Sequence, residues 1–139
     1  MEQQVCETCG FGVWNPVADL SRSRLGIYND ARFRGRCILT LDTHFDNIED
    51  VDVSTLASFM EDIQHSVRAI KKATGSMRVN VAILGNAESH VHAHLIPRYP
   101  SNEEFPNSSP WNDKRPRSEL DAGSMKLLTD EILDALHIV

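Results

Sequence analysis

The sequence predicts an α+β fold, in which an antiparallel β-sheet carries one long amphipathic helix and a second helix near the C-terminus. Two observations lead to this prediction. Apolar residues recur at steps of three and four over residues 54–73, which is typical of a helix with one buried stripe. Short apolar runs bounded by turn residues lie on both sides of that helix, and these runs are typical of strands.

Two strands are expected before the long helix, at residues 25–28 and 37–41. The polar pair Asn29-Asp30 separates them, and Gly35 is expected to bend the chain into the second strand. Farther upstream, residues 14–16 (Trp-Asn-Pro) are interpreted as a turn.

The long helix is expected over residues 54–73. Ser54 is a candidate for its N-cap, Lys71 and Lys72 suit its negative C-terminal end, and Gly75 suits the left-handed residue that ends many helices.

Two more strands are expected after the helix, at residues 79–84 and 90–96. The turn between them is short, which predicts antiparallel neighbours. Residues 100–118 are rich in Pro, Asn, Ser and charge and predict a loop, and residues 119–137 predict the C-terminal helix, with Ser124 as an alternative start. We therefore expect one domain over residues 1–139, with a motif-bearing core at about 6–100.

Composition narrows the class of protein. The net charge of −6 argues against a general nucleic-acid-binding protein, and no apolar run is long enough to span a membrane. The polar N-terminus has no signal-peptide pattern, so a cytoplasmic protein with reduced cysteines is expected. Five arginines within residues 22–36 could receive a small anionic ligand, although each could equally be a solvated surface residue.

His90, His92 and His94 occupy alternate positions, so on a strand their imidazoles share one face. The central ring can be a nucleophile if its other nitrogen is held by a hydrogen bond, and an outer ring can donate a proton or bind an oxyanion. A metal site made from all three imidazoles is the main alternative.

Residues 90–98, His-Val-His-Ala-His-Leu-Ile-Pro-Arg, resemble the H-x-H-x-H-x-x-P-R signature of the histidine triad (HIT) superfamily of nucleotide hydrolases and transferases. The resemblance extends over about residues 6–100. It implies a homodimer that hydrolyses a nucleoside 5′-phosphate anhydride or phosphoramidate, such as a diadenosine polyphosphate. His92 would be the catalytic nucleophile that carries the nucleotide covalently, and His94 would contact the scissile phosphate.

The third triad residue is His rather than Gln, which favours the hydrolase branches of the superfamily. Two alternatives stay open: a nucleotidyl transferase or phosphorylase of the same superfamily, and a nucleotide-binding protein with little activity.

Four residues are expected to bind the substrate. Arg98 could neutralise phosphate, and Asn86 and Ser89 could donate hydrogen bonds to it. The turn before the triad lacks the Gln that binds phosphate in many members, and Asn86 is the best candidate to replace it. Asn29 resembles, in position, the ribose-contacting residue of the family.

Cys6 and Cys9 form a C-x-x-C pair, which alone is a weak indication of a metal site. One branch of the superfamily holds a structural zinc ion with such a pair, a histidine after the second core strand and the first triad histidine. The resemblance therefore implies a zinc site formed by Cys6, Cys9, His44 and His90.

Overall fold

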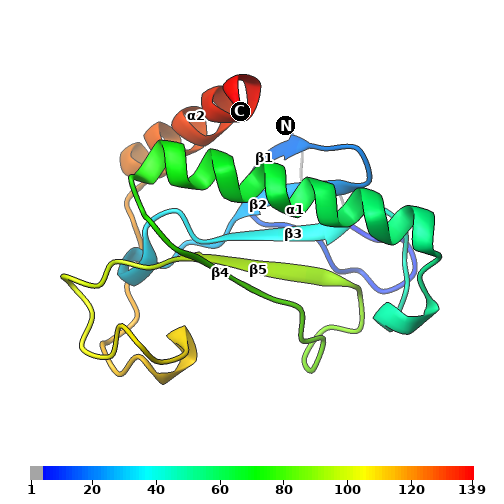
Figure 1. Cartoon of the computed structure of the whole chain (residues 1–139), viewed down its shortest axis with the longest axis horizontal. Coiled ribbons are helices and arrows are strands. Elements are labelled where there is room, and N and C mark those ends of the chain that lie inside the picture. The colour runs from blue at the N-terminus through cyan, green and yellow to red at the C-terminus, as the bar shows by residue number, and fades with distance from the viewer. Residues whose placement is uncertain (1–4) are drawn as a thin grey trace.

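The computed structural model describes residues 5–139 and contains a five-stranded sheet and two α-helices (Figure 1). The elements along the chain are β1 (Pro16–Asp19), β2 (Ser23–Ile27), β3 (Cys37–Leu41), α1 (Val53–Thr74), β4 (Val79–Ala82), β5 (His92–Pro97) and α2 (Ala122–Ile138). Short 3-10 helices lie at Ala31–Phe33, Ile48–Asp50 and Pro110–Asn112. The strand order is β1-β2-β3-β5-β4, and every neighbouring pair is antiparallel. The predicted α+β fold class is confirmed.

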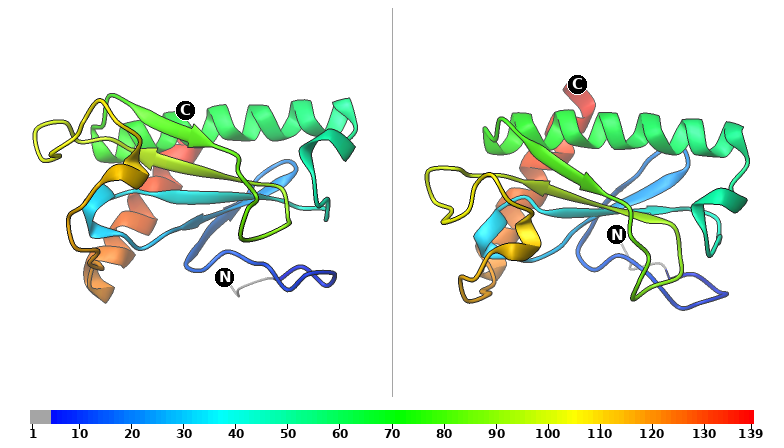
Figure 2. Two further views of the ribbon diagram at one scale, coloured as in Figure 1. Left: turned by 90° about the horizontal axis from the view of Figure 1, so that it is seen from below. Right: turned by 60° about the horizontal axis from the view of Figure 1, so that its bottom comes forward.

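Helix α1 covers one face of the sheet, and the segment before β1 lies on the other face (Figure 2). Helix α2 packs against α1 and against β1. The core lies between the helices and the sheet, where alternate strand residues such as Leu39, Ala93 and Leu95 are fully buried together with Phe59 of α1. The opposite face of the sheet is therefore the one available for a site.

Helix α1 begins one residue earlier than predicted because its N-cap is Asp52 and not Ser54. The Asp52 carboxylate accepts a hydrogen bond of 3.0 Å from the backbone N–H of Thr55, which satisfies a donor that the first turn leaves free. At the other end Gly75 adopts φ = 74°, the left-handed conformation that the sequence predicted.

Strand β1 was not predicted. Pro16, which we expected inside a turn, is its first residue, and β1 occupies the edge of the sheet, where a residue without a backbone N–H is tolerated. The predicted histidine strand starts later than expected, at His92, so that His90 precedes β5.

Residues 98–121 contain no α-helix or strand, in agreement with the predicted loop. Helix α2 begins at Ala122, between the two starts considered, because the Asp121 carboxylate caps it through the backbone N–H of Ser124. Within residues 5–139, neither helix combines the length and the apolar character that a membrane crossing requires.

Candidate active site and metal-ligand cluster

His92 and His94 lie side by side on the sheet face opposite α1. In the β3–β5 register, His92 is paired with Thr40 and His94 with Ile38, while Ala93 points into the core. The two rings meet edge to face, with centroids 5.2 Å apart. The alternation that the sequence predicted therefore places both imidazoles on the free face.

One nitrogen of His92 is held by the backbone. Nδ1 donates a hydrogen bond of 2.6 Å to the carbonyl oxygen of His90, and the ring is buried against Phe11 at a centroid distance of 4.9 Å. This bond fixes the tautomer with the proton on Nδ1. Nε2 makes no hydrogen bond to any described residue and is the nitrogen available for chemistry.

A cavity of about 450 Å³ opens in front of the two imidazoles. Its walls come from four parts of the chain: the segment before β1, strands β2 and β3, the turn before the triad, and Trp111 of the long loop. Most of the lining is apolar or aromatic, with a few polar groups, which is typical of a pocket for a small molecule.

The imidazole of His94 lies between the sheet and the long loop. Trp111 packs edge-on against its ring at 5.4 Å, and its buried Nδ1 has no hydrogen-bond partner among the described residues. Burial, with further contributions from the charges of His92 and Arg36, lowers the pKa of His94 to about 4. His94 is therefore neutral at pH 7.

Arg36 is a cavity residue that the sequence did not single out. Its guanidinium lies over the ring of Tyr28 at 4.0 Å, and Arg36 and Tyr28 both line the cavity beside the histidines. The only indication in the sequence was its place in the arginine-rich stretch of residues 22–36.

The four predicted metal ligands converge at one point. Their ligand atoms, from Cys6, Cys9, His44 and His90, all lie within 4.8 Å of one another. The Cys6 Sγ–His44 Nδ1 distance is 3.6 Å and the Cys9 Sγ–His90 Nδ1 distance is 3.5 Å. Tetrahedral zinc with ordinary Zn–S and Zn–N bonds places sulfur and nitrogen about 3.6 Å apart, so the donor set fits the ion.

The surroundings of these ligands also suit a metal. His44 Nε2 donates to Asp46 at 2.6 Å and His90 Nε2 to the Leu41 carbonyl at 2.7 Å, which leaves both Nδ1 atoms directed at the thiols. Burial opposes ionisation of Cys6, but backbone N–H groups of Cys9 and Thr8 lower its pKa to about 6. A thiolate, the form that binds metals, is thereby favoured.

The four predicted substrate-binding residues are not brought together. Asn86 lines the cavity, whereas Ser89 is exposed and is not part of the lining. The Asn29 side chain pairs with the backbone of Leu120, through a 3.1 Å bond to its carbonyl and a 2.8 Å bond from its N–H. Both ends of that amide therefore hold the chain just before α2 in place.

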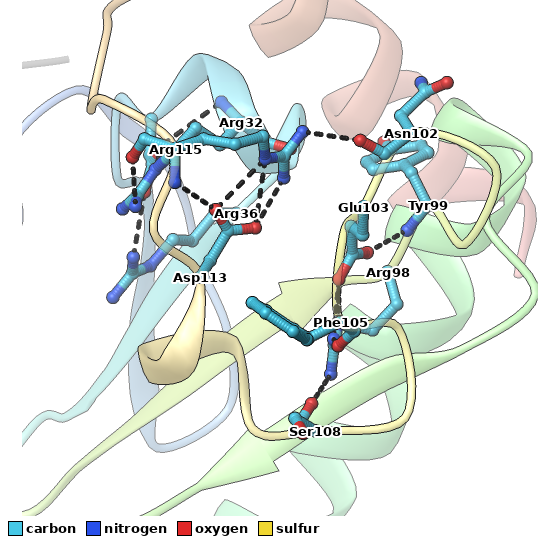
Figure 3. Close-up of polar contacts among 11 residues, drawn as sticks. Arg32, Arg36, Arg98, Tyr99, Asn102, Glu103, Phe105, Ser108, Asp113 and Arg115 are labelled. Carbon is cyan, nitrogen blue, oxygen red and sulfur yellow. Dashed lines mark hydrogen bonds and ion pairs between the residues drawn. The ribbon is translucent and has the colours of Figure 1, made fainter.

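Arg98 is buried outside the cavity and anchors the long loop (Figure 3). Its guanidinium donates to Glu103 and Asn80, and to the carbonyl oxygens of Phe105 and Ser108. Arg115 ties the same loop to the 3-10 helix after β2 by donating to the carbonyls of Asn102 and Arg32. These contacts fix the loop that carries Trp111.

Comparison with known proteins places these features in a family. Residues 19–101 match the HIT domain family. No curated protein matches the sequence significantly.

Solved structures share the fold. A histidine triad protein from Bradyrhizobium japonicum superposes with a TM-score of 0.78 at 24% identity, covering 87% of this chain and 89% of that one. A zinc-bound histidine triad family protein from Mycobacterium smegmatis gives 0.60 at 18% identity, with 86% and 84% covered. The Plasmodium falciparum diadenosine triphosphate hydrolase gives 0.62 at 15% identity, with 94% and 80% covered. The matched segment, which includes all three triad histidines and more than half of the chain, shows that the chain belongs to the HIT family.

Proposed function

We propose that the protein is a hydrolase that cleaves a nucleoside 5′-phosphate anhydride or phosphoramidate through a covalent nucleotidyl-histidine on His92. The observation that carries this proposal is the hydrogen bond from His92 Nδ1 to the His90 carbonyl, which leaves Nε2 free beside the cavity. The structural similarity to a diadenosine triphosphate hydrolase supports a dinucleoside polyphosphate as the type of substrate.

The reaction has two steps. Nε2 attacks the α-phosphorus, the N–P bond forms, and the bond from phosphorus to the leaving phosphate or amine breaks with its electron pair on the leaving group, an amine taking up a proton from solvent. Water then attacks the same phosphorus and gives up a proton to solvent, the N–P bond returns its electrons to Nε2, and a nucleoside 5′-monophosphate is released. The His90 carbonyl stabilises the positive charge that the ring carries between the two steps.

The other groups of the cavity suit this role. Displacement at phosphorus needs an in-line nucleophile and fixed donors more than proton transfer. The neutral ring of His94 and the side chain of Asn86 can contact phosphate oxygens, and the aromatic walls can receive a nucleoside.

The cysteine–histidine cluster supports a structural zinc ion as cofactor, in line with the zinc-bound relative from Mycobacterium smegmatis. A zinc ion there would cross-link the segment before β1 to β3 and β5, and so hold Phe11 and His90 against His92. The chemistry itself would stay with the imidazoles.

Turnover by a variant tests the proposal. His92→Ala should abolish hydrolysis of diadenosine polyphosphates and adenosine phosphoramidate while its circular dichroism spectrum stays that of the wild type. His137→Ala, which removes an exposed imidazole of α2, is the matched control and should keep full activity. Acid-labile addition of a nucleoside monophosphate to the intact protein, lost in His92→Ala, would support the covalent intermediate.

Two results would overturn parts of the proposal. Near wild-type turnover by His92→Ala would exclude the nucleophile. A nucleoside diphosphate product on adding inorganic phosphate would reassign the protein as a phosphorylase.

The homodimer and the cytoplasmic location stay predictions. Strand β4 lies at the edge of the sheet, so one side of its backbone is unpaired, and its Val81 side chain is half-exposed. Such an edge can pair with the same edge of a second copy. Sedimentation equilibrium of the purified protein measures this directly.

A further inference from the structure

Arg36 is a buried cation with unused hydrogen-bonding capacity. Its side chain is 7% exposed, and its only hydrogen bond among the described residues runs from Nη1 to Asp30 Oδ2, at 3.1 Å. The Nε atom is buried and has no hydrogen-bond partner within residues 5–139. Nη2 also makes no hydrogen bond to a described residue and is not among the buried unpartnered atoms, so it is the donor that a ligand in the cavity can reach. An unpaired N–H on a largely buried guanidinium is costly, and an anionic ligand would satisfy it.

The charge of Arg36 is not neutralised by its neighbours. Asp30 is fully buried, and Arg32 occupies both of its oxygens, with Nε 3.0 Å from Oδ1 and Nη2 2.9 Å from Oδ2. One carboxylate thus serves two guanidinium groups. The cluster keeps a net positive charge at the side of Arg36 that lines the cavity.

The aromatic neighbours hold Arg36 without compensating this charge. Tyr28 lies under its guanidinium at 4.0 Å, and Trp111 is 5.8 Å away. A second cation, Arg117, lies 4.6 Å from the same Tyr28 ring. Stacking on an aromatic ring holds the planar guanidinium in place and leaves its edge N–H groups free for an anion.

We propose that Arg36 binds the phosphate oxygens of the substrate in the cavity, the role that the sequence assigned to Arg98. This inference rests on the proposed function and specifies which residue holds the anion. Arg98 cannot serve in this position, because its guanidinium is already bonded to Glu103, Asn80 and two backbone carbonyls. Arg36 lies beside His94, whose pKa its charge lowers, so a phosphate in contact with the histidines meets this cation.

Ligand binding to Arg36→Gln tests the proposal, with AMP, adenosine and inorganic pyrophosphate as calorimetric probes. We expect AMP and pyrophosphate to bind at least tenfold more weakly than to the wild type, and adenosine affinity to change less than twofold. Arg36→Lys keeps the charge without the planar fork, so it should recover part of the loss. Thermal unfolding of each variant shows whether it is folded.

Arg32→Gln is the matched control. This variant removes the ion pair of Arg32 with Asp30, but Arg32 does not line the cavity. The affinity for AMP should therefore stay within twofold of that of the wild type. Equal losses in Arg32→Gln and Arg36→Gln, parallel losses of AMP and adenosine, or no binding of AMP and pyrophosphate by the wild type would each overturn the proposal.

The test of Arg36 can succeed or fail independently of the test of His92 as the nucleophile. Pyrophosphate and AMP binding do not need turnover, so Arg36 can be confirmed even where His92→Ala stays active. If the wild type is active, kcat/KM of Arg36→Gln shows which phosphate Arg36 contacts. A fall for both the phosphoramidate and the anhydride indicates the attacked phosphate, and a fall for the anhydride alone indicates the leaving phosphate.

Discussion

The carbonyl oxygen of His90 accepts a 2.6 Å hydrogen bond from Nδ1 of His92, and the side chain of the same His90 belongs to the cysteine–histidine cluster. One residue therefore connects the candidate metal centre with the proposed nucleophile. Its backbone sets the tautomer of His92, and its ring is fixed by Cys9 and by the Leu41 carbonyl.

Removing the thiol pair should release a metal and loosen this connection. Purified wild-type protein is expected to contain one zinc ion per chain, and Cys6→Ser/Cys9→Ser none. The double variant should melt roughly 10 °C lower, because metal binding contributes to folding. Elemental analysis and thermal unfolding provide the measurements.

Cys37→Ala is the control for that experiment, since Cys37 is buried in the core away from the cluster, and it should retain the zinc. Wild-type protein without stoichiometric zinc, together with an unchanged melting temperature in the double variant, would show that the cluster is not a metal site.

His94 makes stability depend on pH in a defined window. Its pKa is lowered to about 4, whereas an imidazole in the unfolded chain has a pKa of about 6.5. Between these values the unfolded state binds the proton and the folded state does not, so stability falls as the pH decreases from about 6.5 to about 4. Above about 6.5 this group has no effect.

His94→Gln should remove that dependence. From pH 7 to 4.5, urea unfolding should show a loss for the wild type that exceeds the loss for the variant by an amount of order 2 kcal/mol. Parallel stability curves for the two proteins would contradict the low pKa.

The buried pair of Arg98 and Glu103 should hold the long loop in place. Their side chains are 6% and 1% exposed, and loss of one partner leaves the other charge buried and unpaired. Glu103→Gln is therefore expected to lower the free energy of unfolding by about 3 kcal/mol. Chymotrypsin should also cut sooner in the loop, after Trp111, since Phe105 is followed by Pro106 and is resistant. Arg78→Gln, at an exposed neighbour, should do neither.

Gly26 lets the N-terminal segment approach the sheet. A Cβ at this position would lie 2.6 Å from Cβ of Val13 and 2.8 Å from the carbonyl oxygen of Trp14. Gly26→Ala should therefore displace a wall of the cavity and raise the KM severalfold. Gly123→Ala in α2 has ordinary contact distances and should raise stability by about 0.5–1 kcal/mol without changing the KM. Equal KM values for the two variants would argue against the close packing.

Local patterns predicted much of the fold. The apolar repeat of α1 depends on its own residues, and Gly75 ends that helix as predicted. Helix ends were less certain because competing caps stand close together, as with Asp52 and Ser54. Strand β1 was missed because its four residues carry too little pattern and depend on pairing with β2.

The sequence by itself determined that His92 and His94 share one face, since alternation on a strand is a local property of the backbone. It also indicated the four converging metal ligands, through the family resemblance that the structure supports. Only the tertiary structure decided which arginine faces the cavity. Arg98 and Arg36 are equally cationic in the sequence, but their surroundings come from distant segments. The loop after β5 surrounds Arg98 with acceptors, whereas strand pairing and the shared carboxylate of Asp30 leave Arg36 with a free N–H. Long-range packing, and not residue type, sets the hydrogen bonds that each guanidinium retains.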